Sequence, residues 1–205
     1  LLATGLLCCV AIWVKSTVTL ILFGIGLSSL AGALMALVTN FAPNPFYLSD
    51  MITWMLGSVA NRSLLDIALV LPFMLAGLLL LLSQRKGLTL LSLGEDTAST
   101  LGLSLTTTRI CVVLGAGLAT GAAVSLAGVI GFVGIVTPHL VRPLVNYEPG
   151  KTIIPSAVLG GVFLVLIDIG VRIISTNVEL KIGVLAALVG APIFIWIASK
   201  SGRHE

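Results

Sequence analysis

The sequence predicts an all-α protein that forms a polytopic bundle of transmembrane helices. Of its 205 residues, 58% are apolar and only 9% are charged, whereas soluble proteins carry roughly 25% charged residues. The mean hydropathy is +1.17. The apolar residues also gather in runs close to the roughly 20 residues that cross a hydrocarbon core. We therefore expect a single transmembrane domain, residues 1–205, with about six full spans and one truncated span.

The expected spans follow from the length of each apolar run and from the polar residues between runs. The first run, Leu1–Val14, is too short to cross a membrane, so we interpret the chain as a C-terminal fragment. A signal peptide is the alternative, but no basic region precedes the run and no A-x-A-like site follows it before Lys15. The full spans are Val18–Val38, Leu64–Leu82, Ile110–Ala127, Val129–Val145, Ile153–Val171 and Ile182–Ala198.

The basic residues predict the orientation, because alternate loops lie on opposite faces and cytoplasmic loops are rich in Lys and Arg. One face has Arg62, Arg172 and Lys181. The other collects Lys15, Arg85, Lys86, Arg109, Arg142, Lys151, Lys200 and Arg203. We therefore expect the polar loop Ser92–Ser104 and the C-terminus in the cytoplasm. Because the basic residues are scattered singly, they indicate membrane topology and argue against nucleic-acid binding.

Catalytic and metal-binding motifs are lacking in the sequence. The cysteines lie in apolar runs without C-x-x-C spacing, which argues against a disulfide framework or a metal site. His139 and His204 are far apart. Gly150-Lys-Thr is not a Walker A motif, because Val145 occupies the position of its first glycine. We therefore expect no enzyme activity, cofactor or metal, and any use of ATP must come from another chain. The cysteines are Cys8, Cys9 and Cys111.

The polar loop Ser92–Ser104 has the signals of a short helix. Glu95 and Asp96 would lie in its first turn, where acidic groups complement the helix dipole. Gly102 can end the helix in a left-handed conformation, and Ser104 can cap the next helix. Leu101 and Leu103 would then form an exposed apolar knob at the cytoplasmic mouth. An ordinary interfacial loop remains the alternative.

Two further features could carry function. Glycine density from Gly128 through Gly131 to Gly134 disfavours a continuous helix, so this break, with Pro138 after it, is a candidate pathway or hinge element. The alternative is a tight outward turn, which position alone favours. Asp168 and Arg172 have the spacing of an i,i+4 ion pair. The pair is either a structural neutralisation in the membrane or a support for an arginine that meets an acidic partner protein; both can hold together.

Several segments, in order, resemble one family. The resemblance rests on "ITWMLGS" at Ile52–Ser58, then on "LSLGEDTASTLGLSLTTTRI", "AGVIGFVGIVTPHLVRPLV", "IIPSAVLGGVFLVLIDIGVRII" and "ELKIGVLAALVGAPIFIWI". These segments are similar to the permease subunits of ABC importers for iron-siderophores, haem and cobalamin, the FecCD type. The chain departs from the family at Val129 and Lys181, where relatives usually have proline.

The resemblance implies a ten-helix permease of the plasma (inner) membrane. It would work as a homo- or heterodimer with two ATP-binding subunits below and a substrate-binding protein above. The family's coupling loop, two short helices that dock on the ATPase, falls on Gly94–Ser104. Its outward arginine falls on Arg172, with Lys181 nearby, and its path helices fall on Val18–Val38 and Ile182–Ala198. The implied coupling residues are Gly94, Glu95, Asp96, Ala98, Leu101, Gly102 and Leu103.

The sequence is therefore interpreted as a permease that imports an iron-siderophore, haem or cobalamin and is driven by a partner ATPase. One alternative is a secondary transporter or channel with a broken-helix path at Gly128–Gly134. Such a protein would need a carboxylate or polar cluster at mid-membrane depth, and Asp168 lies too near the outer end of its span. The other alternative is a truncated, non-functional permease fragment. The choice among substrates is left open, because the binding protein makes it in this family.

Overall fold

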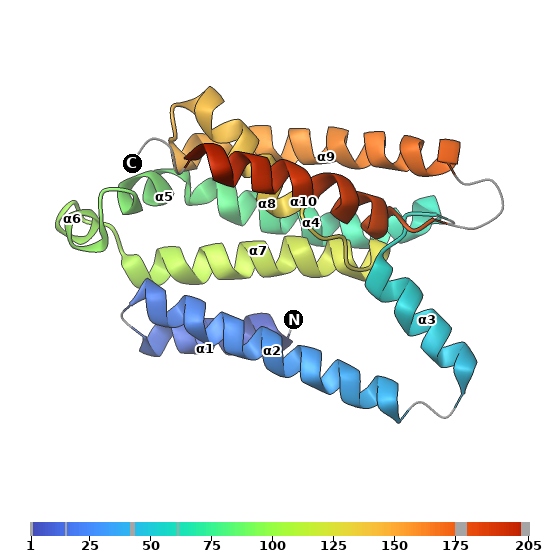
Figure 1. Ribbon diagram of the computed structural model, residues 1–205. Helices are drawn as coiled ribbons and strands as arrows, with labels where there is room; N and C mark the ends of the chain where they lie inside the picture. The colour runs from blue at the N-terminus through green and yellow to red at the C-terminus, as the bar shows by residue number, and fades with distance from the viewer. Residues whose placement is uncertain (1, 15, 42–43, 61, 175–179, 202–205) are drawn as a thin grey trace. The chain divides into compact units, whose positions relative to one another are not determined.

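The computed structural model describes residues 2–14, 16–41, 44–60, 62–174 and 180–201. Lys15, Arg203 and His204 lie outside the described residues. Within them every regular element is a helix, which confirms the predicted all-α class (Figure 1). The elements are α1 (Leu2–Trp13), α2 (Thr17–Asn40), α3 (Pro45–Leu56), α4 (Leu64–Ser83), α5 (Arg85–Leu91), α6 (Glu95–Thr100), α7 (Leu105–Ala127), α8 (Val133–Val141), the 3₁₀ turn η1 (Arg142–Val145), α9 (Pro149–Ile174) and α10 (Ile182–Ser201).

Four helices of the described residues are long and apolar enough to cross a membrane, namely α2, α4, α7 and α9. They have 24, 20, 23 and 26 residues and contain four of the six predicted spans. The apolar part of α10 is shorter, covering Ile182–Ile197. These spans were placed by the length of each apolar run and by the polar residues between runs, and the two signals together located the four long hydrophobic helices.

The span predicted over Val129–Val145 differs from the structure. Its α-helix, α8, has only nine residues, which at 1.5 Å per residue is about 14 Å and too short to cross a membrane. The backbone of Gly128 and Phe132 has positive φ, +72° and +64°, so α7 cannot continue into α8. Pro143 then has no N–H to donate to the carbonyl four residues earlier, and the chain continues as η1.

The connection predicted between Asn40 and Arg62 also contains a helix, α3. Pro45 occupies its first position, where the missing N–H of proline costs nothing. Gly57 follows its last residue with φ +64°, a common way to end a helix. The proline and the glycine therefore mark the two ends of a helix that the sequence analysis did not predict.

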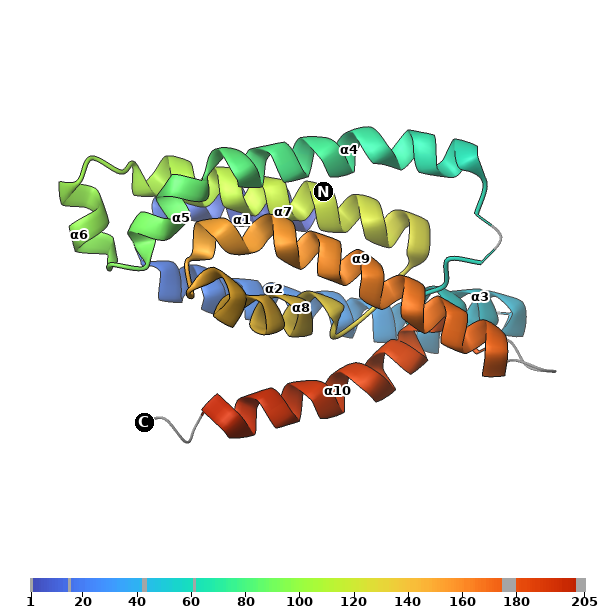
Figure 2. The ribbon, with the colours of Figure 1, turned by 90° about the horizontal axis from the view of Figure 1, so that it is seen from above.

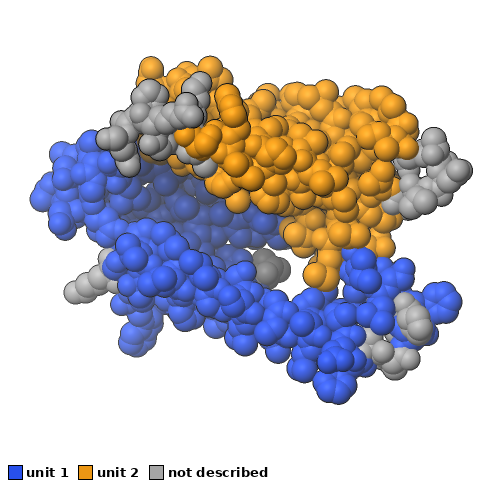
Figure 3. All heavy atoms as spheres, in the orientation of Figure 1, with its two compact units in different colours: residues 1–52, 64–123 blue, residues 53–63, 124–205 orange. Residues whose placement is uncertain are grey.

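The structure divides into two compact units, which are coloured separately in Figure 3. Unit 1 comprises Leu1–Ile52 and Leu64–Ala123, and unit 2 comprises Thr53–Ser63 and Val124–Glu205. In unit 1, α1 packs on α2 and α5 on α6. Helices α4 and α7 approach closely at two glycines: a Cβ added to Gly77 would lie 2.5 Å from the carbonyl oxygen of Gly115. Small residues at such crossings allow close backbone contact in membranes.

In unit 2, α8, α9 and α10 pack on one another (Figure 2). One cluster of buried residues lies between the C-terminal half of α9 and the first turns of α10. The buried core residues are Ile167, Val171, Ile182 and Ala186. This core places the end of α9, which carries Asp168 and Arg172, beside the start of α10.

Candidate functional site

The predicted coupling loop is a pair of short helices, α5 and α6, joined by a tight turn at one end of unit 1 (Figure 1). The resemblance placed both short helices within Gly94–Ser104. Within that range the structure has one short helix, α6, and the other short helix, α5, begins upstream at Arg85. We call residues 85–104 the α5–α6 turn.

Gly102 has the predicted left-handed backbone, and Gly94, for which the sequence made no such prediction, also has a positive φ. Gly94 precedes α6 with φ +98° and Gly102 follows it with φ +86°. The Leu103 amide donates to the Ala98 carbonyl and the Gly102 amide to the Ser99 carbonyl, both at 3.0 Å. This pair of bonds is a Schellman motif, which satisfies carbonyls that the helix end leaves open. The end of α6 is therefore fixed by its own backbone.

Glu95 and Asp96 lie in the first turn of α6, as predicted, but their surroundings differ. Asp96 is exposed. The Glu95 side chain is 35% exposed and forms an ion pair with Arg109, Oε2 to Nη2, at 2.7 Å. Its Oε1 accepts hydrogen bonds from the hydroxyl and, at 3.3 Å, the amide of Thr17. The Thr17 hydroxyl bond and then the Arg109 guanidinium hold the pKa of Glu95 below its ordinary value.

Arg109 completes this contact from α7. Its side chain is only 7% exposed, and Nη1 donates to the carbonyl oxygen of Val14 at 3.3 Å. We call Glu95, Arg109, Thr17 and the Val14 carbonyl the Glu95 junction. It joins α6, the first turns of α7, the start of α2 and the residue after α1.

The partners of Glu95 were not predicted, because 78 residues separate Thr17 from Glu95. One signal was available for the arginine. Charged residues inside apolar segments are costly unless they are paired, and Arg109 directly precedes a predicted span. An arginine at that position needs an acidic partner, although the sequence did not indicate which residue it is.

The apolar knob is only partly as predicted. Leu101 is 60% exposed, and so is Leu93, which the sequence did not single out. Leu103 is half-buried and turns inward, because its Cδ1 lies 3.2 Å from where a Cβ of Gly87 in α5 would be. Ala98 is fully buried. The exposed apolar side chains of the α5–α6 turn are therefore Leu93 and Leu101, whereas Ala98 and Leu103 pack inside it.

The glycine break lies against the end of α3 within unit 2. The Val129 amide donates to the Trp54 carbonyl at 3.1 Å, and the Ser58 amide to the Ala127 carbonyl at 2.7 Å. A Cβ added to Gly128 would overlap the Trp54 carbonyl oxygen. By contrast, Cβ atoms added to Gly131 or Gly134 would meet nothing within 4 Å. The break is thus a tight turn at Gly128 followed by open glycines.

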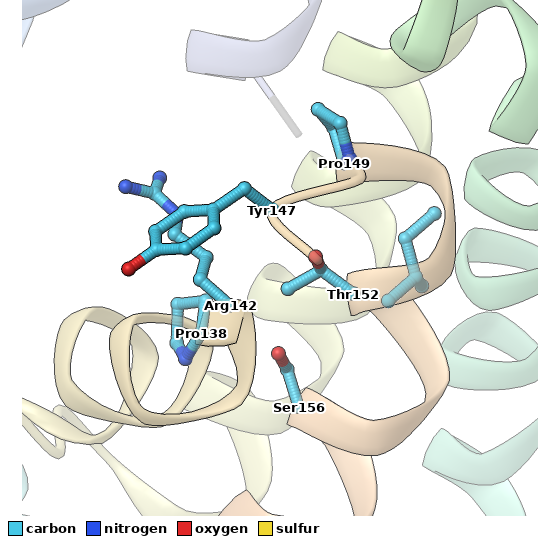
Figure 4. A pocket seen from close by; sticks show the side chains of 7 residues that line it. Pro138, Arg142, Tyr147, Pro149, Thr152 and Ser156 are labelled. Atoms are coloured by element: carbon cyan, nitrogen blue, oxygen red, sulfur yellow. The ribbon is translucent and has the colours of Figure 1, made fainter. Parts of the chain in front are cut away.

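Pro138, the fourth residue of the predicted pathway or hinge element, is not part of the tight turn at Gly128. It lies within α8 and lines a cavity of about 400 Å³ between α8, η1 and the start of α9. Figure 4 shows the Arg142 and Tyr147 side chains on one side of this cavity and the Thr152 and Ser156 hydroxyls on the other. The structure therefore does not bring Pro138 together with Gly128.

The predicted pair near the end of α9 is formed. Arg172 Nε lies 2.8 Å from Asp168 Oδ2, and the Arg172 side chain is 71% exposed. Lys181 is half-buried before the start of α10. Residues 175–179 of the loop between the two bases lie outside the described residues. Asp168 thus pairs with an arginine whose side chain is largely exposed.

Comparison with known proteins gives the context of these sites. The model of the FecCD transport family matches residues 1–200. The chain belongs to the FecCD transport family. An uncharacterized ABC transporter permease protein of Bacillus subtilis, YvrB, is 38% identical over 92% of the chain and 53% of its own length. The vitamin B12 import system permease BtuC of Salmonella typhi is 37% identical over 92% of the chain and 57% of its length.

A solved structure agrees with these relatives. It is described as an inward-facing metal-chelate type ABC transporter, and it matches with a TM-score of 0.87 and 31% identity over 96% of this chain and 63% of that one. The chain therefore spans little more than half the length of the FecCD relatives that it matches. The relatives are transport permeases, so membership of the FecCD family favours an ABC permease over a secondary transporter or channel.

Proposed function

We propose that this chain forms part of the permease subunit of an ABC importer that carries an iron-siderophore, haem or cobalamin across the plasma membrane. FecCD family membership over residues 1–200 supports the importer. Cobalamin has the most direct support among the substrates, because the Salmonella relative is named for vitamin B12 import. The neighbour described as a metal-chelate type transporter supports a chelated metal more generally.

The energy would come from a partner ATP-binding subunit that contacts the α5–α6 turn. The observation that carries this proposal is the exposed pair Leu93 and Leu101 on a turn that is otherwise fixed from inside. Exposed leucines on a rigid surface are typical of a protein interface rather than of a solvated loop. The excess of basic residues on the same side of the predicted spans supports a cytoplasmic position for the turn and the C-terminus.

The opposite face would receive a substrate-binding protein. Arg172 is oriented by Asp168 and exposed, so its guanidinium can still form a charge-assisted bond with a carboxylate of a partner. Lys181 would add positive charge to the same face. A second permease subunit would complete the pathway with α2 and α10, which have many exposed apolar side chains.

The test uses the full-length permease assembled with its ATPase and binding protein. Leu101→Asp should lower substrate-stimulated ATP hydrolysis and uptake of labelled cobalamin by about tenfold or more, because it places a charge at the centre of an apolar contact. Leu144→Asp is the matched control, since Leu144 is 81% exposed on η1, outside the turn. Normal coupling in the Leu101 variant would contradict the proposed contact.

The substrate is tested separately in a strain that lacks the importer. Labelled cobalamin, ferric siderophore and haem are compared for uptake after the full-length gene is restored. We expect uptake of one of the three. Failure of all three, with the complex inserted and assembled, would contradict the substrate class while leaving the permease assignment intact.

A further inference from the structure

We propose that Glu95 is a positioning residue that transmits movement of the α5–α6 turn to the start of α2. The inference rests on the proposed function, because it assumes that a partner pushes on the turn. According to this proposal, the two neighbouring acids of α6, Glu95 and Asp96, have different roles. Asp96 is exposed and available to a partner, whereas the carboxylate of Glu95 is already occupied within unit 1.

Both oxygens of the Glu95 carboxylate are engaged with different elements. Oε1 accepts from the hydroxyl and amide of Thr17, and Oε2 pairs with Arg109. Bonds in which the acceptor is ionised are shorter and stronger than neutral hydrogen bonds. The α6 helix is therefore tied by one side chain to α2 and to α7 at once.

The bond to Thr17 also supplies a hydrogen-bond acceptor that α2 lacks at its N-terminus. Thr17 is the first residue of α2, and the preceding Ser16 makes no side-chain cap bond. The first N–H groups of a helix have no intrahelical acceptor, and a negative charge at this end is favoured by the helix dipole. Glu95 thus acts as an N-terminal cap of α2 although it belongs to another helix.

Arg109 fixes the same corner from the other side. Its Nη1 donates to the Val14 carbonyl, just after α1, while Nη2 pairs with Glu95. A displacement of α6 must therefore either carry the corner between α1 and α2 with it or break these bonds. Since α6 is itself held by its Schellman motif, the first outcome requires fewer broken contacts.

A purely local role for Glu95 predicts a different result from a transmitting role. A local role would lower the stability of the turn but leave the number of ATP molecules hydrolysed per substrate unchanged. The chain offers a matched control in the ion pair of Glu148 and Lys151. Its N–O distance is also 2.7 Å and its glutamate is 34% exposed, yet its partners are three residues apart.

The first measurement is the ratio of ATP hydrolysed to cobalamin transported by the full-length importer in liposomes. We expect Glu95→Gln and Thr17→Val to raise this ratio about fivefold or more, whatever the absolute rate of ATP hydrolysis. Thr17→Ser, which keeps the hydroxyl, should restore the ratio, and Glu148→Gln should not change it. An unchanged ratio in Glu95→Gln would overturn the proposal.

The second measurement does not depend on transport. Hydrogen exchange of the Thr17 amide in the full-length permease should become about fivefold faster in Glu95→Met, which removes the acceptor oxygen, the factor expected for a lost N-cap interaction. It should stay unchanged in Glu148→Met. Equal exchange in the two variants would overturn the positioning role even if transport fails. An importer that moves no substrate but shows the expected exchange would instead contradict the proposed function alone.

Discussion

The α5–α6 turn of unit 1 and the glycine break of unit 2 both bend the chain through glycines with positive φ, but they are held differently. At Gly94 and Gly102 an added Cβ would meet nothing within 4 Å. At Gly57 it would lie 2.6 Å from the Val129 carbonyl oxygen, and at Gly128 it would overlap that of Trp54. Gly94 and Gly102 of the turn serve only the backbone conformation, whereas Gly57 and Gly128 also provide space for a neighbouring carbonyl.

The two regions therefore differ in whether their contacts can adjust to a small displacement. The turn is tied to its neighbours through the side chains of the Glu95 junction, whose torsions can adjust to a small displacement while the bonds hold. The break is held by backbone packed directly on backbone, and such contacts have no alternative arrangement at small displacements. The turn is thus suited to receive a movement, and the break is suited to resist one.

The largest effect is expected at the break. Gly128→Ala should lower the free energy of unfolding by about 3 kcal/mol, because the methyl group overlaps the Trp54 carbonyl and the backbone has φ +72°. Gly131→Ala, whose Cβ meets nothing within 4 Å, is the control and should change stability little. Thermal unfolding of the full-length protein in detergent measures both. Equal midpoints would show that the break is not rigid.

The next effect is expected at the Glu95 junction. Arg109→Met should cost about 2 kcal/mol, less than a fully buried pair because Glu95 is partly exposed. Lys151→Met breaks the exposed Glu148 pair and should cost at most about 0.5 kcal/mol. Double-mutant cycles with Glu95→Gln and Glu148→Gln measure the two coupling energies. Similar values would remove the distinction between the junction and a surface pair.

A smaller effect is expected at the open glycine of the turn. Gly102→Ala should cost about 1 kcal/mol, since only the left-handed backbone opposes it. Gly102→Asn should cost less, because asparagine tolerates this conformation. Chemical unfolding in detergent compares the two variants. A cost as large as that of Gly128→Ala would mean that the turn is packed as tightly as the break.

The smallest effect concerns pH. Because the pKa of Glu95 is lowered in the fold from an ordinary 4.5, its contribution is fully present above that value. It is lost as pH falls through the lower folded pKa. The change should be well under 1 kcal/mol at this partly exposed site. Unfolding midpoints of wild type and Glu95→Gln, compared from about pH 6 to about pH 3.5, should converge at the acid end; parallel curves would contradict this assignment.

What the sequence could predict was local. The long spans, the left-handed Gly102 and the i,i+4 pair of Asp168 and Arg172 depend on neighbours within a few residues, and the structure contains all of them. The contact of Glu95 with Thr17 depends on how helices pack, so no spacing rule could give it. The short α8 was missed because apolar composition does not reveal a positive φ at Phe132.

The crossing of α10 with the end of α3 has a mechanical consequence. Gly183, in the first turn of α10, packs directly on the Leu56 carbonyl oxygen and near that of Val129. Gly190, two turns further on, is also in close contact, since an added Cβ would lie 2.7 Å from the Phe132 Cβ. These two contacts leave the part of α10 beyond Gly190 freer to move than its first turns. Over the 11 residues from Gly190 to Ser201, about 17 Å, a rotation of about 10° would move the far end by about 3 Å. Spin labels near Gly190 and at the C-terminal end of α10 should therefore show little movement at the first position and more at the second.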